Sequence, residues 1–166
     1  MLQPVRRRTW APKGQTPIQK SWGRHDRLSG ISALSLSPVR QRLGFYFRLH
    51  RHNIRFGEVL QFLKLLHRVL GRKLVVVLDF HRIHREAVRL LRESHADWLE
   101  VEWLPFYAPE LNPVEQIWNH SKYSDLANFI PADVEALYEQ VEVSLRGQRC
   151  RPDLIQSFFK FAKLEL

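Results

Sequence analysis

The sequence has only one cysteine, Cys150, among its 166 residues. A single cysteine excludes a disulfide within the chain and a zinc site made of several thiolates, and it favours a reducing, cytoplasmic setting. Long apolar runs are also lacking, because none approaches the roughly 20 residues that cross a bilayer. The basic stretch 1–8 has no apolar segment of the kind that a secretory signal requires. We therefore expect no membrane partner.

Acidic residues are scarce relative to basic ones, with 17 Asp and Glu against 26 Lys and Arg, which gives a net charge of +9. Such an excess of positive charge favours polyanionic partners, chiefly nucleic acid, and an ordinary basic protein is the alternative. Hydrophobic residues make up 45% of the chain, which is enough for a sizeable core. The length and the composition predict one globular domain over 1–166.

Hydrophobic periodicity predicts strands followed by a helix in the first half of the chain. The near alternation of apolar and polar residues over 28–36 and over 43–50 predicts two strands, paired as a hairpin around Ser37-Pro38. Apolar residues at helical spacing then predict a helix over 56–70. Gly71 is a natural stop for this helix.

The second half begins with an unbroken run of valine and leucine, 74–78, which predicts a central strand covered on both faces. The later patterns predict a helix, a strand near the sheet edge and three more helices, at 83–91, 98–104, 113–118, 134–145 and 154–162. In the last helix, core packing is the leading interpretation of Phe158, Phe159 and Phe161, and an oligomer contact is the alternative. This order of elements predicts a layered α/β domain.

Asp79 follows the apolar run directly, so it stands at the carboxyl end of the predicted strand. Open α/β sheets place their ligands at this end. The alternatives are an exposed aspartate without a function and an ion pair with Arg82, Arg85 or Arg89, because an unpaired charge beside an apolar strand is costly.

Glu115 falls in the first turn of a predicted helix, with Asn112 as its N-cap and Pro113 at the first helical position. Three residues after the N-cap is also the capping-box position, so helix capping alone is one explanation of this carboxylate. The loop before it carries prolines at four-residue intervals, Pro105, Pro109 and Pro113. A rigid loop that aims one carboxylate suits a site with strict geometric demands.

Carboxylates that converge at one end of a sheet suit hard divalent cations such as Mg²⁺, which take oxygen ligands and keep several waters. Two such ions, roughly 3.5–4 Å apart, activate an attacking water or hydroxyl and stabilise the leaving oxygen. This is the chemistry of phosphodiester cleavage, and it agrees with the basic charge of the chain.

The residues around these two carboxylates resemble the DDE-superfamily transposases, most closely the bacterial insertion-sequence branch related to mariner. The first matching stretches are Leu78-Asp79 and His84. The most specific stretch is Leu104-Pro105-x-Tyr107-x-Pro109-Glu110-Leu111-Asn112-Pro113-Val114-Glu115-x-x-Trp118, followed by Lys122. A further match runs from Arg8 to Pro17. The resemblance extends over nearly the whole chain.

The resemblance implies an RNase H-like fold, a mixed five-stranded sheet flanked by helices. It implies DNA cleavage at transposon ends and strand transfer, driven by two Mg²⁺ or Mn²⁺ ions. Asp79 would be the second catalytic carboxylate and Glu115 the third, each a metal ligand, with His84 and Asn112 in supporting positions. It further implies a homo-oligomer in the active complex and action on the nucleoid in a bacterial cytoplasm.

Two departures from the family pattern qualify these expectations. Phe80 stands where the family usually has Asn after the second Asp. The family's first Asp lies on a strand upstream of the stretch that begins here at Arg8. We therefore expect this chain to be the C-terminal part of a catalytic domain, without its first strand and first Asp, and weak or inactive alone. The alternatives are a non-catalytic DNA-binding or assembly remnant, and a degenerate reading frame with no selected role.

Basic residues that flank these motifs are candidate contacts to DNA phosphates, although exposed basic residues are common in any protein. They are Arg6, Arg7, Arg8, Lys13, Arg40, Arg42, Arg82, Arg85 and Lys122.

Overall fold

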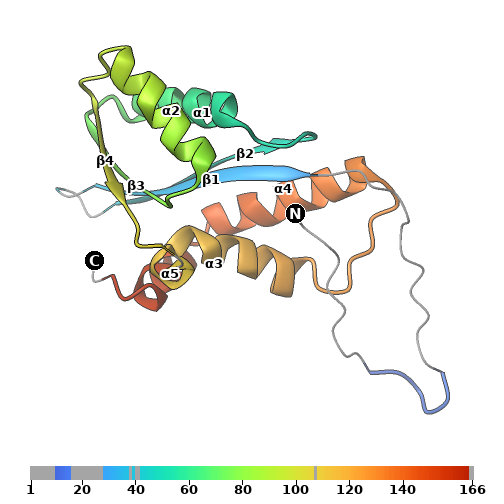
Figure 1. The fold of residues 1–166 in the computed structure, drawn as a ribbon. Helices are drawn as coiled ribbons and strands as arrows, with labels where there is room; N and C mark the ends of the chain where they lie inside the picture. The colour runs from blue at the N-terminus through green and yellow to red at the C-terminus, as the bar shows by residue number, and fades with distance from the viewer. Residues whose placement is uncertain (1–9, 16–27, 38, 40–41, 107, 165–166) are drawn as a thin grey trace.

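A β-hairpin lies at the centre of the computed structural model, which describes residues 10–15, 28–37, 39, 42–106 and 108–164. Its strands are β1 (Ser29–Leu36) and β2 (Leu43–His50), antiparallel from Ser29↔His50 to Leu36↔Leu43, as predicted. Because side chains alternate along a strand, Ile31 and Ala33 lie against one helical layer and Phe45 and Phe47 against another. Both faces of the hairpin are therefore covered (Figure 1).

The first helical layer consists of α1 (Phe56–Leu70) and α2 (Arg82–Glu93), which pack against each other. Both helices occur where the periodicity predicted them. Gly71 ends α1 in the left-handed conformation, with φ 62°, and its N–H donates to the carbonyl of His67 at 2.8 Å. The buried core of this layer consists of Val59, Phe62, Leu63, Leu66, Ala87 and Leu91.

The strands β3 (Leu74–Leu78) and β4 (Leu99–Trp103) form a parallel pair beside the hairpin. Leu74 and Val76 pack on the helices of the first layer. The opposite face is open, because Val75 is 65% exposed and Val77 is 58% exposed. The prediction that this strand is covered on both faces is therefore wrong: the helices that follow β4 pack chiefly on the hairpin.

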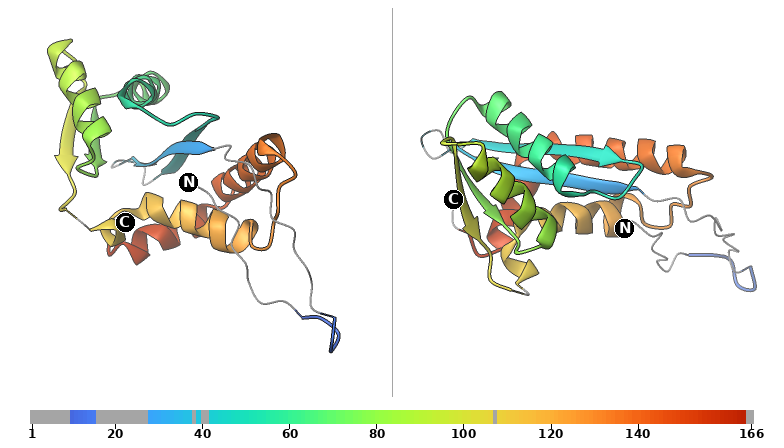
Figure 2. Two further views of the ribbon diagram at one scale, coloured as in Figure 1. Left: turned by 45° about the vertical axis from the view of Figure 1, so that its right-hand side comes forward. Right: turned by 45° about the horizontal axis from the view of Figure 1, so that its top comes forward.

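The sheet is divided into two parts, a feature that the periodicity did not reveal. Among the described residues, β1 pairs only with β2, and β3 pairs only with β4. Both parts rest on the same helices, α1 and α2, so the layers remain those of a mixed α/β domain (Figure 2). As predicted for a strand near the sheet edge, β4 buries Val101 and exposes Glu100 and Glu102.

The second helical layer covers the other face of the hairpin. It consists of α3 (Pro113–His120), the π-helical turn η2 (Ser121–Asp125), α4 (Val134–Arg149) and α5 (Pro152–Phe161). In α5 the buried stripe includes Ile155, Phe158 and Phe159. Phe161 lies off this stripe and is 62% exposed, so the expectation of core packing is wrong for this residue alone of the three phenylalanines.

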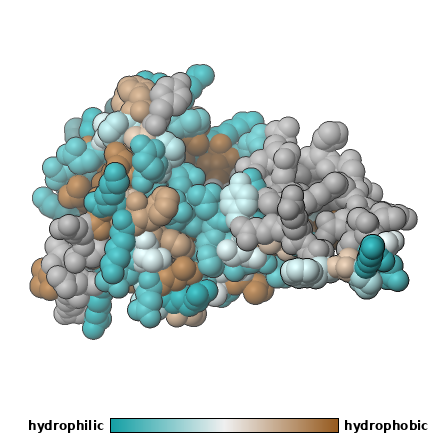
Figure 3. Space-filling view, turned by 90° about the horizontal axis from the view of Figure 1, so that it is seen from below, coloured by the Kyte–Doolittle hydropathy of each residue, from teal (hydrophilic) through white to brown (hydrophobic). Residues whose placement is uncertain are grey.

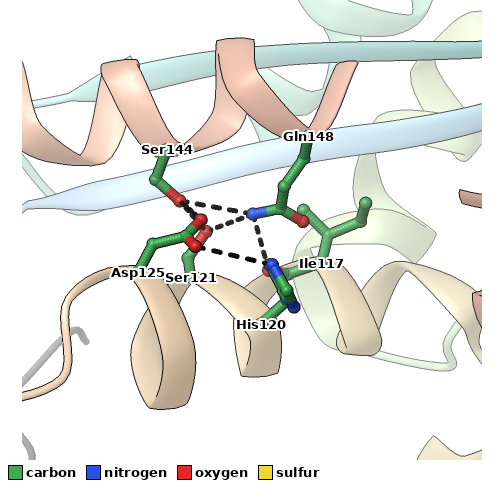
Figure 4. Close-up of polar contacts among 6 residues, drawn as sticks. All are labelled: Ile117, His120, Ser121, Asp125, Ser144 and Gln148. Atoms are coloured by element: carbon green, nitrogen blue, oxygen red, sulfur yellow. Dashed lines mark hydrogen bonds and ion pairs between the residues drawn. The ribbon is translucent and has the colours of Figure 1, made fainter. Parts of the chain in front are cut away.

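A buried chain of hydrogen bonds fastens η2 to α4 (Figure 4). The side-chain amide of Gln148 donates to Ser121 Oγ at 2.7 Å, and Ser121 Oγ lies 2.8 Å from Ser144 Oγ. Ser144 in turn donates to Asp125 Oδ2 at 2.7 Å. With each group donating to the next, the chain ends on the carboxyl group of Asp125. The π turn thus has a fixed partner in α4.

Close packing between Trp118 and Gly30 fixes α3 on the hairpin. A Cβ atom at Gly30 would lie 2.3 Å from Cη2 of the Trp118 ring, so only glycine leaves room for the indole. Ile117, the preceding residue, is fully buried in the same layer. This contact sets the position of the helix that carries Glu115.

The surface seen from below is mainly hydrophilic. Among the described residues on this face, apolar side chains form small separate patches between polar ones (Figure 3). No helix in the described ranges is long and apolar enough to cross a membrane.

We predict that Gly30→Ala lowers the free energy of unfolding by about 1–3 kcal/mol, the usual cost of overpacking. The measurement is chemical denaturation. Gly147→Ala is the matched control, because a Cβ there meets nothing within 4 Å in the exposed part of α4. That control should stabilise the protein by roughly 0.5–1 kcal/mol. Adding Trp118→Phe to Gly30→Ala should recover part of the loss, and an unchanged loss would contradict a clash with the indole.

Candidate catalytic site

Asp79 lies at the carboxyl end of β3, directly before α2, and its side chain is about half exposed. Its Oδ1 accepts a hydrogen bond from Nδ1 of His84 and another, at 3.3 Å, from the backbone N–H of His81. The His84 bond is the main cause that lowers the pKa of Asp79, while partial burial opposes it. Asp79 is therefore ionised at neutral pH.

None of the arginines weighed as partners of Asp79 forms an ion pair with it. Arg89 instead bonds Glu86 and Glu93, each at 2.7 Å. The guanidinium of Arg85 lies 4.8 Å above the ring of Phe80. The structure therefore does not support an arginine salt bridge as the explanation of Asp79.

His84 lies within the first turn of α2 and directs its ring at Asp79, a contact that its place in the motif did not specify. His81 was not predicted as a site residue. It is the N-cap of α2, where its Nδ1 accepts the N–H of Ile83 at 3.4 Å while its own N–H reaches Asp79. Histidine is a rare N-cap. The only sign of its role in the sequence was therefore its position between Asp79 and the predicted helix.

Glu115 lies in the first turn of α3, as predicted, and Asn112 is the N-cap of that helix. Asn112 Oδ1 accepts the N–H of Val114 at 3.1 Å. The N–H of Asn112 donates to the carbonyl of Pro109 at 3.1 Å, within the short 3₁₀ helix η1 (Pro109–Leu111). Because that N–H is already used, Glu115 does not close a capping box, and its carboxylate forms no hydrogen bond with any described residue.

The two carboxylates are electrostatic neighbours. Burial raises the pKa of Glu115, and the negative charge of Asp79 raises it further. The chain leaves the carboxyl end of β4 and reaches the start of α3 through a short connection that includes η1 (Figure 1). The site thus combines one ionised carboxylate with a second whose ionisation is opposed, an arrangement that a divalent cation would relieve.

These two oxygen donors fit a hard cation, but they do not complete a ligand set. Among residues 10–15, 28–37, 39, 42–106 and 108–164, no three His, Cys, Asp or Glu side chains are grouped so as to hold a metal ion. A third ligand is therefore not supplied by the described part of the chain.

The candidate DNA contacts fall into separate groups. Arg82 and Arg85 are exposed on α2, next to Asp79 in the chain. Lys122 lies in η2, further along the helical segment that begins with α3, and its Nζ is 5.1 Å from the ring centre of Tyr123. Arg42, at the hairpin end, is exposed. Lys13 belongs to an exposed turn, 10–15, far from β3 and β4 in both ribbon figures.

Four of the predicted phosphate contacts, Arg6, Arg7, Arg8 and Arg40, lie outside the described residues. A group that the sequence reasoning missed is aromatic: the ring of Phe80, which follows Asp79 in the chain, contacts the rings of Trp103 and Phe106. The sequence did contain a sign of this group: Phe80 lies just after one predicted strand, and Trp103 lies near the end of another.

Comparisons with known proteins bear on the family and on the fold. Residues 1–137 match the protein family described as DDE superfamily endonuclease. No curated protein matches the chain. Among solved structures, a chain of the "Crystal structure of the Mos1 Strand Transfer Complex" is similar, with a TM-score of 0.62 and 19% sequence identity. The match covers 98% of this chain and 48% of that chain, so this chain spans about half the length of the Mos1 chain.

The structural similarity confirms the expected RNase H-like fold. The five-stranded mixed sheet implied by the resemblance is not found in the described ranges, whose four strands form two separate pairs. The family match covers more than half of the chain, and both Asp79 and Glu115 lie within it. The particular branch, bacterial insertion sequences, stays a prediction. The chain belongs to the DDE superfamily of endonucleases.

Proposed function

We propose that this chain is the catalytic domain of a transposase that cleaves DNA at the ends of an insertion sequence and joins the cut strand to a target. The observation that carries the proposal is the proximity of Asp79 and Glu115, at a strand end and a helix start. Each lies in the segment whose residues resemble the family. His84 and His81 hold Asp79 in place from α2.

Asp79 and Glu115 would hold Mg²⁺ or Mn²⁺, with two ions in a complete site. When bound, such ions activate the attacking oxygen and stabilise the leaving oxygen of the phosphodiester. The chain's own contribution is to keep Asp79 ionised through His84 and to present Glu115 from a helix with a fixed start at Asn112. Two like charges near each other, with no described lysine or arginine paired to them, provide the negative field that attracts the cation.

DNA is the proposed partner, bound through the basic residues on α2 and in η2. A homo-oligomer would bring two transposon ends together, and the bacterial nucleoid would be the place of action. The net charge of +9 supports binding that weakens with salt, because phosphate contacts release counterions.

The second candidate function is a catalytically inactive remnant that binds DNA or assists assembly. It is favoured by the incomplete ligand set among the described residues. We propose that the third carboxylate comes from outside those residues. Both functions predict salt-sensitive DNA binding, and only the first predicts metal-dependent nicking.

We predict that the purified chain binds Mn²⁺ in a calorimetric titration and that Asp79→Ala and Glu115→Ala each weaken this binding at least about 10-fold. The physical reason is that each variant removes one of two oxygen donors. Glu139→Ala is the control, because Glu139 is an exposed carboxylate on α4, away from the site.

Nicking of supercoiled DNA in Mn²⁺ should be lost or weakened in Asp79→Ala and Glu115→Ala and retained in Glu139→Ala. Equal binding by Asp79→Ala and the parent chain would refute the metal role of the pair. Absence of binding in a chain shown to be folded by circular dichroism would favour the inactive remnant.

We predict that, without metal, Glu115→Gln stabilises the protein at neutral pH by roughly 0.5–1 kcal/mol. The pKa of Glu115 is raised in the folded state, so its ionisation opposes folding above that pKa. Glutamine removes this penalty. The advantage should shrink as the pH falls through the raised pKa and disappear below the unfolded value of about 4.3, because the parent Glu115 is then protonated in both states.

The measurement is the melting temperature of both proteins across this pH range, with Glu139→Gln as control. Saturating Mn²⁺ should make the parent more stable than Glu115→Gln, since the parent gains more stability from the bound ion. A stability difference that does not change with pH would contradict a titrating Glu115.

A further inference from the structure

The open face of β3 and β4 combines apolar side chains with negative charge. Val75 and Val77 are 65% and 58% exposed on β3. Their partners in the parallel register are Glu100 and Glu102 of β4, so these side chains form one block, which we call the acidic face. Both glutamates are exposed, and neither forms an ion pair with a described residue. Single exposed valines are ordinary, whereas adjacent apolar side chains are typical of a surface that a partner covers.

The charge of the acidic face determines which class of partner fits it. Nucleic acid is disfavoured, because Glu100 and Glu102 repel phosphates. A purely apolar partner would take two carboxylates out of water without compensation, which is costly. Lys73 is exposed but precedes β3, nearer to the start of the strands, so the block itself stays negative. The complementary partner therefore presents apolar side chains next to lysines or arginines.

The C-terminal end of this chain has that composition. Phe161 is 62% exposed and Leu164 is 42% exposed. Each is directly preceded by an exposed lysine, Lys160 and Lys163, and neither lysine forms an ion pair with a described residue. We call these four residues the basic cap; Glu165, the next residue, lies outside the described residues. The basic cap thus offers two apolar side chains and two positive charges, which match the acidic face in number and kind.

Backbone hydrogen bonds give the basic cap a defined shape. The N–H of Lys163 donates to the carbonyl of Lys160 at 3.0 Å, and the N–H of Leu164 donates to the carbonyl of Phe159 at 3.0 Å. This pair of bonds is the Schellman motif that ends many helices. Its left-handed position, with φ 56°, is occupied by Lys163, although glycine is the usual residue there. The end of α5 therefore carries a positive side chain where the backbone favours a residue without one.

One other exposed apolar pair adjoins basic residues. Leu36 and Val39 are exposed at the end of the hairpin, and Arg42 is exposed nearby. Residues 38, 40 and 41 lie outside the described residues, so the surface at this end is only partly described. The basic cap is described at all four of its positions and matches both charges of the acidic face. It is the better partner on both counts.

We propose that the basic cap of one copy of this chain docks on the acidic face of a second copy. Within one chain both surfaces are exposed, so neither covers the other, and the contact has to join two copies. The apolar side chains of the basic cap pack on the two valines, and its two lysines pair with the two glutamates. If each copy gives its basic cap to the other, the assembly closes as a dimer.

This inference rests on the proposed function only for the expectation of a homo-oligomer, and it requires neither metal nor DNA. A contact between two small surfaces should be weak, because interfaces below about 1,200 Å² are typical of transient complexes. Sedimentation equilibrium of the full chain should therefore show reversible self-association. Raising the salt from about 0.1 M to about 1 M should weaken it, as the Debye length falls from roughly 10 Å to 3 Å.

Charge reversal tests the pairing of the two surfaces. One variant carries Glu100→Lys with Glu102→Lys, and the other carries Lys160→Glu with Lys163→Glu. Each variant alone brings like charges together, so its self-association should weaken at least about 10-fold. In an equal mixture, lysines of either variant meet glutamates of the other at both contacts. The mixture should therefore associate about as well as the parent chain.

Two control pairs separate this contact from general effects. Lys64→Glu with Arg68→Glu changes the net charge as much as the C-terminal variant does, on the exposed side of α1, and should leave self-association near that of the parent. Phe161→Ala should weaken association at unchanged charge. Val143→Ala is its control, because Val143 is equally exposed, 62%, but lies on α4.

Three results would overturn the proposal: a parent chain that is monomeric at every concentration, charge variants that associate as the parent does, or a mixture that does not associate. Thermal unfolding of each variant checks that the fold is retained, and Phe161→Ala tests the contact without any change of charge. Failure of the proposed function appears separately, as absent Mn²⁺ binding in the calorimetry, since all sedimentation is done in EDTA without DNA.

Discussion

The charge repulsion between Asp79 and Glu115, which adds to burial in raising the pKa of Glu115, is opposed by contacts elsewhere in the domain. Their segments belong to different layers, one to β3 on the first helices and one to α3 on the hairpin. Nothing local along the chain holds them together. Their proximity depends on two sets of contacts: α3 is fixed on β1 by Trp118 over Gly30, and α2 holds Asp79 through His84. The packing contacts thereby offset the repulsion between the two carboxylates and keep them near each other, as the proposed metal site would require.

The elements that the sequence predicted well are those determined by neighbouring residues. The bounds of α1 follow from its apolar spacing and from Gly71, which adopts the left-handed conformation that ends the helix. The start of α3 follows from Asn112 and Pro113, whose roles as N-cap and first helical residue depend only on the local backbone. The two carboxylates were found by the same logic, since each stands at the end of a recognisable element.

The features that the sequence did not predict depend on which surfaces meet. The sequence of 74–78 is typical of a strand buried on both faces. Val75 and Val77 are nevertheless exposed, because α3, α4 and α5 pack on the hairpin and not on this strand. Glu115 occupies the position of a capping box, but the N–H it would accept is taken by Pro109. The gathering of Phe80, Trp103 and Phe106 likewise arises only when β3 and β4 are folded together. The hydrogen bond from His81 to Asp79 is a local contact, but histidine is not a usual N-cap.

The open face of β3 and β4 has a consequence for the direction from which the proposed DNA partner would approach. Glu100 and Glu102 are exposed there and lie in register with Val75 and Val77, so the apolar stripe runs beside a row of negative charge. Phosphates within about 8 Å of these carboxylates are repelled at physiological salt. Negative charge on the broad side of the strand pair therefore opposes a polyanion there, while the exposed arginines of α2 favour one. Under the proposed function, nucleic acid would approach this sheet from its end and not from its open face.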